Sequence, residues 1–453
     1  MNTRVRRLPG FWGATREEIN RIKNNDPDLT EFDLDHNDMA HITDSAWELL
    51  GGYIADNDYL NTINLVYLQL TDTKMSLLFK NWTRGSTLTT LNLSENNFGV
   101  DGVRSMVPLL RSARNLRRLD MDENQNINTE CFRLIVESLN GGTIEELRML
   151  NCSIDDITAL EHYPLQHLRE LTLNFNKITR IQSLENYTHL ECLRLRENKI
   201  GREGCRSIAK LLDKVGTRLK YLDIDSADMG DEEAETFANS LKFNTVVTSL
   251  DLGGENNITE KGFTLFFRLL NDVSSIDNTY NSNHTLTKLS LPRSTDATIK
   301  KLKNYIDDSI TINERHRGNP HSAGRAKVIA TQLNSNKRIE FCRLQGLAYS
   351  YDSAVSEIEP LLLPEALALV GKNHDQRELY QILIATVPHL VSIVDRRAVI
   401  RQQISANAAQ IAALTAKNLK LNTELALIES AESNRTMAAV DNKLGCRKRC
   451  REN

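Results

Sequence analysis

The sequence predicts an α/β solenoid in its first two-thirds and an all-α region after it. Three observations support this division of the 453 residues. A sequence motif of the form L-x-x-L-x-L-x-x-N, which we call the phrase, recurs at intervals of roughly 20 to 40 residues, as internal repeats do. The phrase stops after Leu291, and the apolar residues beyond it follow helical spacing. The chain has 40% hydrophobic and 26% charged residues, an ordinary globular composition that excludes collagen-like and fully disordered classes.

Ten copies of the phrase cover residues 29–294. The three copies that match at every defined position run over 88–96, 168–176 and 190–198. Looser copies begin at Leu29, Leu65, Leu116, Ile144, Leu219, Val247 and Leu286. In each copy the apolar positions point inward from a short strand, and the chain then turns back over them. The Asn at the ninth position can bond backbone groups of that turn, which have no partner in the sheet.

The ninth position departs from Asn in several copies. Cys152 is an allowed variant, whereas Thr73, Ala227 and Glu255 predict less regular turns.

The longer copies have room for a helix after the strand. Apolar residues from Phe98 to Leu110 follow helical spacing, and the same phrasing begins again at Ile200 and at Met229. These copies resemble the ribonuclease-inhibitor-like subclass of leucine-rich-repeat proteins, which includes Ran GTPase-activating protein and the repeat domains of immune sensors. The resemblance implies a horseshoe with parallel strands on the concave face and helices on the convex face. The shorter copies over 144–167 and 168–189 hold only a turn, so we expect an irregular middle.

Both ends of the solenoid need a cap, because an outermost repeat would otherwise expose its apolar face. Residues 15–18 form a capping box before Ile19 and Ile22, which predicts a short capping helix within residues 1–28. Inside the solenoid we expect helices at 45–54 and 261–270 and a polar loop at 274–284.

For residues 295–390 the sequence pattern predicts a helical cap or small bundle. One stripe of apolar residues over 296–312 suits a cap on the last repeat, and Gly318 to Pro320 marks a break. This region resembles the tails of uncharacterised algal repeat proteins, a resemblance that implies no activity.

Residues 391–432 predict one long helix, because the segment is rich in Ala, Leu and Gln and contains no Pro or Gly. Heptads fitted to it place Ile and Leu along the seam with an Asn at one a position, a pattern typical of parallel dimers. The predicted dimerisation residues are Ile404, Ile411, Leu414, Asn418, Leu421 and Leu425. The alternative is a helix that folds back on the bundle.

Residues 433–453 predict a disordered basic tail. Five basic residues fall within 443–451, which suits a nuclear-import signal or a solvated chain end. The seven cysteines include no CxxC pair, and no secretory signal is recognised. We therefore expect reduced thiols and a cytoplasmic location, with the nucleus as the alternative.

Familiar catalytic signatures do not occur in the sequence. Phosphate loops, dinucleotide folds, hydrolase elbows and zincin sites lack their motifs, so we expect no catalytic residue, no cofactor and no metal. Asp33, Asp35 and Asn37 open like a calcium loop, but Asp38 stands where that loop needs Gly, and the repeat phase explains these residues better. Lys plus Arg number 56 and Asp plus Glu 60, a net charge of −4, and no apolar run is long enough to span a membrane. Neither nucleic acid nor membrane is expected as a partner.

Positions three, five, seven and eight of each copy should line the concave surface, because strand side chains alternate between faces. The candidate partner-binding residues are Asp33, Asp35, Tyr67, Asp120, Asp122, Arg148, Phe175, Arg194, Arg196, Tyr221, Asp223, Asp225 and Asp251. We expect these acids to be solvated, and their excess predicts a protein partner with a basic surface. Two functions remain open: a non-catalytic protein-interaction scaffold that uses this face or, alternatively, a GTPase-activating regulator of a Ran-like small GTPase.

Overall fold

The chain forms two compact units, Met1–Tyr349 and Ser350–Asn453. The computed structural model describes residues 14–34, 42–331, 340–341, 343–345, 413 and 415–425. The first unit contains all the repeats together with the helices that follow them as far as Thr331.

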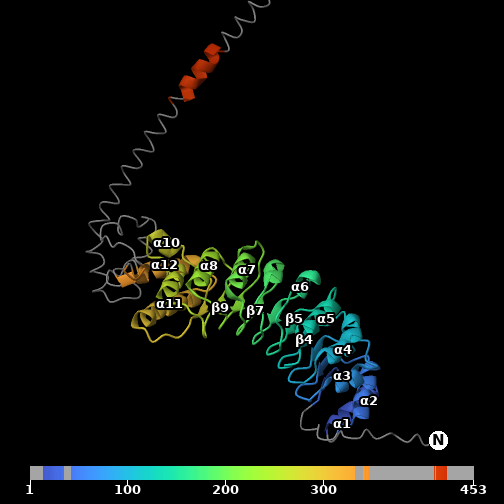
Figure 1. Ribbon diagram of the computed structural model, residues 1–453. Helices are drawn as coiled ribbons and strands as arrows, with labels where there is room; N and C mark the ends of the chain where they lie inside the picture. Colours follow the sequence, from blue (N-terminus) through green and yellow to red (C-terminus); the bar gives the residue numbers. More distant parts are fainter. Residues whose placement is uncertain are drawn as a thin grey trace, which may run out of the picture. The chain divides into compact units, whose positions relative to one another are not determined.

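Ten strands form one sheet in the first unit, and every neighbouring pair is parallel. Their order in the sheet is their order in the chain, as a solenoid requires (Figure 1). The strands are β1 (Glu31–Asp33), β2 (Thr62–Asn64), β3 (Thr90–Asn92), β4 (Arg118–Asp120), β5 (Glu146–Arg148), β6 (Glu170–Thr172), β7 (Cys192–Arg194), β8 (Tyr221–Asp223), β9 (Ser249–Asp251) and β10 (Lys288–Ser290). Their register aligns buried leucines at the strand centres, such as Leu91, Leu119 and Leu147. The predicted α/β solenoid is confirmed.

Helices connect the strands and cover the outer side of the curved sheet (Figure 1). They are α1 (Ala14–Lys23), α2 (Asp44–Ala55), α3 (Asp72–Phe79), α4 (Val100–Ser112), α5 (Thr129–Leu139), α6 (Ala159–His162), the 3₁₀ helix η2 (Gln182–Asn186), α7 (Gly201–Asp213), α8 (Asp231–Leu241), α9 (Glu260–Leu270), α10 (Ile276–Tyr280), α11 (Ala297–Arg315) and α12 (Pro320–Thr331). The two shortest repeats carry only α6 and η2, so the predicted irregular middle is confirmed.

Polar side chains begin several of these helices. Their oxygens accept backbone N–H groups of the first turn, which would otherwise lack partners, at Thr71, Asn128, Thr259, Ser275 and Asp296. Helices α2 and α3 pack closely because Gly51 has no side chain. A Cβ at that position would lie 1.9 Å from the carbonyl oxygen of Leu78.

A ladder of buried asparagines joins consecutive repeats. The side-chain nitrogen of Asn96 donates to the carbonyl oxygens of Leu65 in the preceding repeat (2.8 Å) and Leu93 in its own (2.9 Å). Its Oδ1 accepts the N–H groups of Leu68 and Leu70, both at 3.0 Å. The corresponding bonds to a preceding repeat are donated by Asn124, Asn176 and Asn198. The ladder therefore satisfies turn backbone that no strand can reach.

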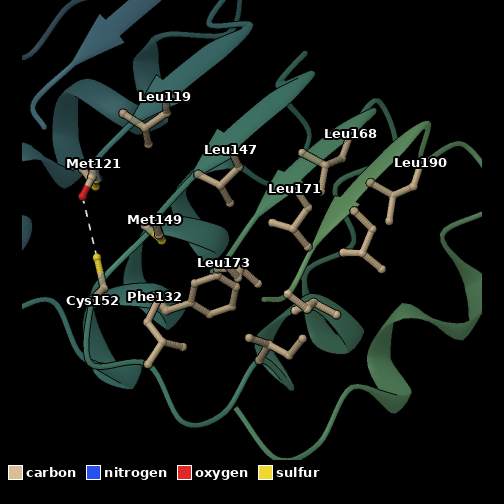
Figure 2. Close-up of a cluster of buried hydrophobic side chains, with 14 of the residues drawn as sticks. Leu119, Met121, Phe132, Leu147, Met149, Cys152, Leu168, Leu171, Leu173 and Leu190 are labelled. Carbon is tan, nitrogen blue, oxygen red and sulfur yellow. Dashed lines mark hydrogen bonds between the residues drawn. The ribbon is translucent and has the colours of Figure 1, made fainter. Parts of the chain in front are cut away.

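Cys152 takes the place of the asparagine in the fifth repeat. Its Sγ donates to the carbonyl oxygens of Met121 at 3.7 Å and Leu150 at 3.6 Å. Figure 2 shows the bond to Met121 at the edge of a buried cluster that includes Phe132 and Leu147. Burial raises the pKa of the Cys152 thiol to about 12, so the donor is a neutral thiol.

The second repeat begins at Leu60, not at the predicted Leu65. β2 begins two residues after Leu60, in parallel register with β1 and β3. The prediction was wrong because Leu65, Leu68 and Leu70 copy the spacing of the phrase. Leu68 and Leu70 are instead buried turn residues held by the asparagine ladder.

Two assignments of the ninth position were also wrong. In the ninth repeat the ladder residue is Asn256 rather than Glu255, and its side chain donates to the carbonyl oxygen of Ile224 at 3.2 Å. The Gly-Gly pair just before it adds one residue to the turn and shifts the asparagine along the chain. Thr73 lies in α3 and holds no ladder position.

Helices close both ends of the solenoid. α1 buries Ile19 and Ile22, so a capping helix is present, although Thr15 lies inside it rather than at its N-cap. α11 buries Leu302 and Ile306 and packs on α9 and β10. The helix predicted from the apolar stripe over 296–312 is therefore present as α11, next to the last strand.

The predicted polar loop at 274–284 is partly helical, because it contains α10, on which α12 packs. Lys327 of α12 is fully buried, and its Nζ donates to the carbonyl oxygen of Asn283 at 2.8 Å. Burial lowers the pKa of Lys327 well below its usual range. The sequence pattern did not distinguish this lysine from a surface one.

In the second unit the structure describes Ala413 and residues 415–425, all of them helical. Asn418, Leu421 and Leu425, three of the predicted dimerisation residues, lie on this segment with exposed side chains. The predictions for Ile404, Ile411 and Leu414, for most of residues 332–412 and for the basic tail fall outside the described residues. No helix in the part of the chain that the structure describes is long and apolar enough to cross a membrane.

Candidate binding surface on the concave face

The concave face is built from positions three, five, seven and eight of each repeat. Positions three and five are the two ends of each strand, so their side chains lie on the side of the sheet opposite the core. The parallel register aligns the position-five residues in one row: Asn92, Asp120, Arg148, Thr172, Arg194, Asp223, Asp251 and Ser290. Charges of opposite sign are neighbours near the middle of this row, whereas two acids are neighbours near its end.

An ion-pair network crosses β4, β5 and β6, and we call it the central network. Arg118 contacts Asp120 at 3.2 Å and Glu146 at 3.0 Å. Arg148 contacts Asp120 at 3.1 Å and Asp122 at 2.7 Å, and it lies 4.0 Å from Glu146. Each of the two arginines therefore contacts two carboxylates of these repeats at 3.2 Å or less and offsets part of their negative charge.

Asp120 and Asp122 are buried, so the prediction that they are solvated was wrong. Oδ1 of Asp122 accepts the N–H of Leu150 at 2.7 Å, and Oδ2 accepts Nε and Nη2 of Arg148 at 3.1 and 2.7 Å. Burial and the neighbouring Asp120 raise the pKa of Asp122. Arg148 opposes that rise, because a cation and its hydrogen bonds favour the charged carboxylate.

Asp223, Asp225 and Asp251 form a second group of acids on β8, β9 and the turn after β8, which we call the acidic cluster. Asp223 and Asp225 are buried, again against the prediction of solvated side chains. Within the described residues, the ion pair of this cluster joins Asp225 Oδ1 to Arg196 Nε at 3.7 Å. Burial, followed by the charges of Asp251 and Asp225, raises the pKa of Asp223 to about 6. At neutral pH the cluster therefore holds negative charge that its surroundings compensate only in part.

Two arginines near β7 lie over aromatic rings. The Arg194 guanidinium is 5.0 Å from the ring centre of Tyr221, and that of Arg196 is 5.7 Å from the ring centre of Phe175. Such cation–π contacts favour one orientation of the ring. Phe175 is nevertheless 44% exposed, so it offers an apolar surface close to the acidic cluster.

The residue at position eight has a left-handed backbone in most repeats. These residues, with φ between 50° and 60°, are Tyr67, Glu95, Glu123, Asn151, Phe175, Glu197 and Ser226. The conformation is unfavourable for residues other than Gly, but it turns the chain sharply after each strand. Tyr67 is 49% exposed, and the three glutamates are exposed as well. We call these seven residues the position-eight row.

The structure brings six of the thirteen predicted residues into two groups: Asp120, Asp122 and Arg148 in the central network, and Asp223, Asp225 and Asp251 in the acidic cluster. Phe175, Arg194, Arg196 and Tyr221 form the two cation–π pairs. Asp33 and Tyr67 lie apart from both, on the first two repeats, and Asp35 lies outside the described residues. Sequence reasoning did not single out Arg118, Glu146 or Glu170, which pair with the predicted residues. All three occupy position three, so the repeat phase was a signal that could have found them.

The described residues contain no group of three His, Cys, Asp or Glu side chains arranged to hold a metal ion. Four cysteines are free thiols, and burial raises their pKa values to about 11 or 12: Cys131, Cys152, Cys192 and Cys205. Such thiols are poor nucleophiles near neutral pH.

Comparison with known proteins agrees with this architecture. The leucine rich repeat family model matches residues 86–107 and 187–209, which hold β3 and β7. Ribonuclease inhibitor of Sus scrofa is 28% identical over 169 residues, 37% of this chain and 33% of that protein. This chain therefore carries leucine-rich repeats and is similar to ribonuclease inhibitor over part of its length.

Two proteins of Dictyostelium discoideum also resemble the repeat protein. Protein CARMIL is 26% identical over 199 residues, 39% of this chain and 18% of that one. Rho GTPase-activating protein gacW is 24% identical over 256 residues, 56% of this chain and 20% of that one. The repeat protein thus spans about a fifth to a third of the length of these curated relatives.

Two solved structures are similar at low TM-scores. The tropomodulin C-terminal domain of Caenorhabditis elegans has 15% identity and a TM-score of 0.27, with 34% of this chain and 93% of that chain covered. An internalin (inlF) of Listeria monocytogenes has 16% identity and a TM-score of 0.25, with 56% and 92% covered.

Proposed function

We propose that this repeat protein is a non-catalytic scaffold that binds a protein partner with a basic surface on its concave face. The observation that carries the proposal is the acidic cluster, which Arg196 links to the exposed ring of Phe175. Three carboxylates share one arginine contact there. Asp251 is partly exposed, so a lysine or arginine of a partner could approach negative charge that is compensated only in part. A solenoid commonly binds through its concave face because that surface is long and continuous.

Phe175 supports the same location. Aromatic side chains often contribute much of the binding free energy of an interface. The ring lies against Arg196, and its backbone is fixed in a tight turn, so little freedom remains to be lost on binding. The central network is less suited to a basic partner, because Arg118 and Arg148 each contact two of its acids at 3.2 Å or less.

A triple variant of the full chain tests the acidic cluster: Asp223→Asn, Asp225→Asn and Asp251→Asn. Proteins that the wild-type chain captures from a lysate should be retained less by this variant, and the difference should shrink as salt is added. The matched control removes three exposed acids from the convex helices: Glu203→Gln, Glu232→Gln and Glu235→Gln. Equal retention by the triple variant and the wild type would contradict the proposal.

Phe175→Ser tests the apolar part of the site. Retention of the same proteins should fall about tenfold, the loss expected when an aromatic anchor is removed. Tyr59→Ser is the control, because Tyr59 is also about half exposed (42%) but precedes β2 and lies off the concave face. A control that loses as much as Phe175→Ser would place the binding surface elsewhere.

We also propose that the C-terminal helix makes a homodimer through its heptads. Leu421 and Leu425 are exposed apolar side chains at successive d and a positions of the described segment, one turn after Asn418. Leu421→Glu with Leu425→Glu should convert a dimer into a monomer by analytical sedimentation. A wild-type chain that is already monomeric at micromolar concentration would contradict this.

A second candidate function is regulation of a small GTPase, with a Ran-like GTPase as the substrate that the sequence suggests. It is favoured by the 24% identity to a protein named Rho GTPase-activating protein, although this chain covers 20% of that protein. GTP hydrolysis by a panel of small GTPases, with and without the chain, separates this candidate from a scaffold. We place either activity in the cytoplasm or the nucleus, where free thiols stay reduced.

A further inference from the structure

Two neighbouring repeats present an exposed apolar side chain at the same position. Val215 and Phe243 each lie six residues before the first residue of the next strand, just after the C-cap residues of α7 and α8. Val215 is 101% exposed and Phe243 is 84% exposed. Those C-cap residues are Lys214 and Lys242, so in both repeats a lysine directly precedes the exposed apolar residue.

The other eight repeats show that the fold does not require an apolar residue here. Counted back by the same six residues from each strand, the position holds Asn25, Asp56, Arg84, Ser112, Asn140, Pro164, Asn186 and Ser282. All of these are polar or proline. Val215 and Phe243 pack against almost nothing in their own chain, so repeat stacking gives no reason for their apolar character.

Cations occupy the same kind of segment as these two side chains, on the edge of the sheet where the strands begin. We define this basic edge as Arg169, Lys214, Arg218, Lys220 and Lys242, all of which lie between a helix and the first residue of the next strand. Its acids are Glu191, which pairs with Lys220 at 2.7 Å and Arg169 at 3.5 Å, Asp213 at the end of α7, and Glu185, whose carboxylate interacts with the charge of Lys214. The five cations outnumber these three carboxylates. The concave face has the opposite balance around the acidic cluster.

We propose that the basic edge docks on an anionic membrane surface, with Val215 and Phe243 inserted among the lipid headgroups. Apolar side chains flanked by lysines are suited to such an interface, because the ring or alkyl group enters the lipid while the ammonium groups meet anionic headgroups. Lys242 already has this geometry, since its Nζ lies 5.4 Å from the ring centre of Phe243.

The lysines next to the two protruding side chains favour an anionic bilayer over a protein partner. A protein partner would need a preformed pocket for each protruding side chain, whereas a fluid bilayer adapts to any protruding shape. The sequence-based expectation of no membrane partner rested on the net charge of the whole chain, −4. That sum conceals the separation of the acidic cluster from the basic edge.

Sedimentation of the full chain with lipid vesicles tests the proposal. Vesicles of phosphatidylcholine with about 30 mol% phosphatidylserine should bind the chain at low salt, and vesicles of phosphatidylcholine alone should not. Val215→Ser with Phe243→Ser should weaken binding about tenfold through the lost apolar contact. Lys214→Glu with Lys242→Glu should weaken it by about 30-fold or more, since each cation near an anionic surface contributes roughly fivefold.

The matched control makes the same change of charge elsewhere, at Arg84→Glu with Lys288→Glu. Arg84 holds the equivalent position in the third repeat, and Lys288 lies on β10. This control should bind within about twofold of the wild type. Thermal unfolding midpoints equal to that of the wild type would show that all variants are folded.

Four results would overturn the proposal. They are a wild-type chain without preference for anionic vesicles, a serine variant that binds like the wild type, and a control that weakens as much as the lysine variant. The fourth is an acidic protein that binds through these residues when vesicles do not. None of these bears on the proposed scaffold function, because the basic edge and the acidic cluster share no residue.

Discussion

The concave surfaces of β4–β5 and of β8–β9 differ in how their acids are compensated. In the central network, Arg118 and Arg148 lie within 3.2 Å of the acids they neutralise. In the acidic cluster, the ion pair described between Arg196 and Asp225 spans 3.7 Å. The difference follows from which residue the next strand supplies in register: Arg148 faces Asp120 across β4 and β5, whereas Asp251 faces Asp223 across β8 and β9.

This comparison separates two uses of one repeat position. Where neighbouring strands carry opposite charges, position five stabilises the sheet by cross-strand pairing. Where neighbouring strands carry like charges, the side chains at position five repel each other, and a ligand of opposite charge can reduce that repulsion. The four predictions below test this division, beginning with the largest expected effect.

Arg148→Met should destabilise the fold by about 2–4 kcal/mol, because it leaves two buried carboxylates without their shared cation. Arg196→Met should cost less than about 1 kcal/mol, since its ion pair is longer and the side chain is partly exposed. Urea unfolding of the two variants measures the contrast. Equal losses would mean that the two regions are compensated alike.

Gly254→Ala should cost about 1–3 kcal/mol. Gly254 has φ of 63°, and a Cβ there would lie 2.0 Å from both Asp225 Oδ1 and Ser226 Oγ, so the acidic cluster occupies the space of a side chain. Gly216→Ala is the control for the backbone alone, since φ there is also positive but the Cβ would meet open space. A thermal midpoint that falls no further for Gly254→Ala than for the control would contradict the steric argument.

Asp223→Asn should stabilise the fold at neutral pH by about 1 kcal/mol. The folded-state pKa of Asp223 is raised from 3.8 to about 6, so between these two pH values the native state holds a proton that the unfolded chain has lost. Stability from this group is therefore lost as the pH rises between those two values. The advantage of the variant should shrink toward pH 4, as measured by unfolding free energy against pH. Asp213→Asn, a change at an exposed acid, is the control.

Glu95→Gly should raise stability slightly, by about 0.5 kcal/mol. Glu95 belongs to the position-eight row with φ of 57°, a conformation that Gly adopts without strain. Glu95→Ala keeps the strain and should give no gain. The urea midpoints of both variants would show whether the row is strained in repeats outside the acidic cluster.

The solenoid was readable from the sequence because the leucines of the phrase are core residues in every repeat. The same signal misplaced the second repeat, because Leu65, Leu68 and Leu70 have the spacing of the phrase. Leu65 is in fact its sixth position, and Leu68 and Leu70 lie in the turn that follows. A hydrophobic pattern records burial, and a buried turn cannot be told from a buried strand by spacing alone.

For the candidate surface, the sequence predicted only which residues lie on the concave face, because that follows from the position of each residue in its repeat. The phase assigned Asp122 and Asp223 to the concave face. It could not show that neighbouring side chains bury both, because burial depends on pairs that lie about 25 or more residues apart in sequence, such as Asp122 with Arg148. The left-handed backbone of Phe175 was also hidden, since no glycine marks it.

The asparagine ladder has a mechanical consequence. Each ladder amide donates a hydrogen bond to the repeat before it, as Asn198 does to the carbonyl oxygen of Leu173. An interior repeat therefore cannot open without breaking hydrogen bonds to both of its neighbours. A solenoid pulled by its two ends should therefore peel from a terminus, one repeat at a time. Each step would release one repeat of about 28 residues, or roughly 90 Å of contour length. The chain would therefore extend in a series of small steps rather than in one global unfolding event.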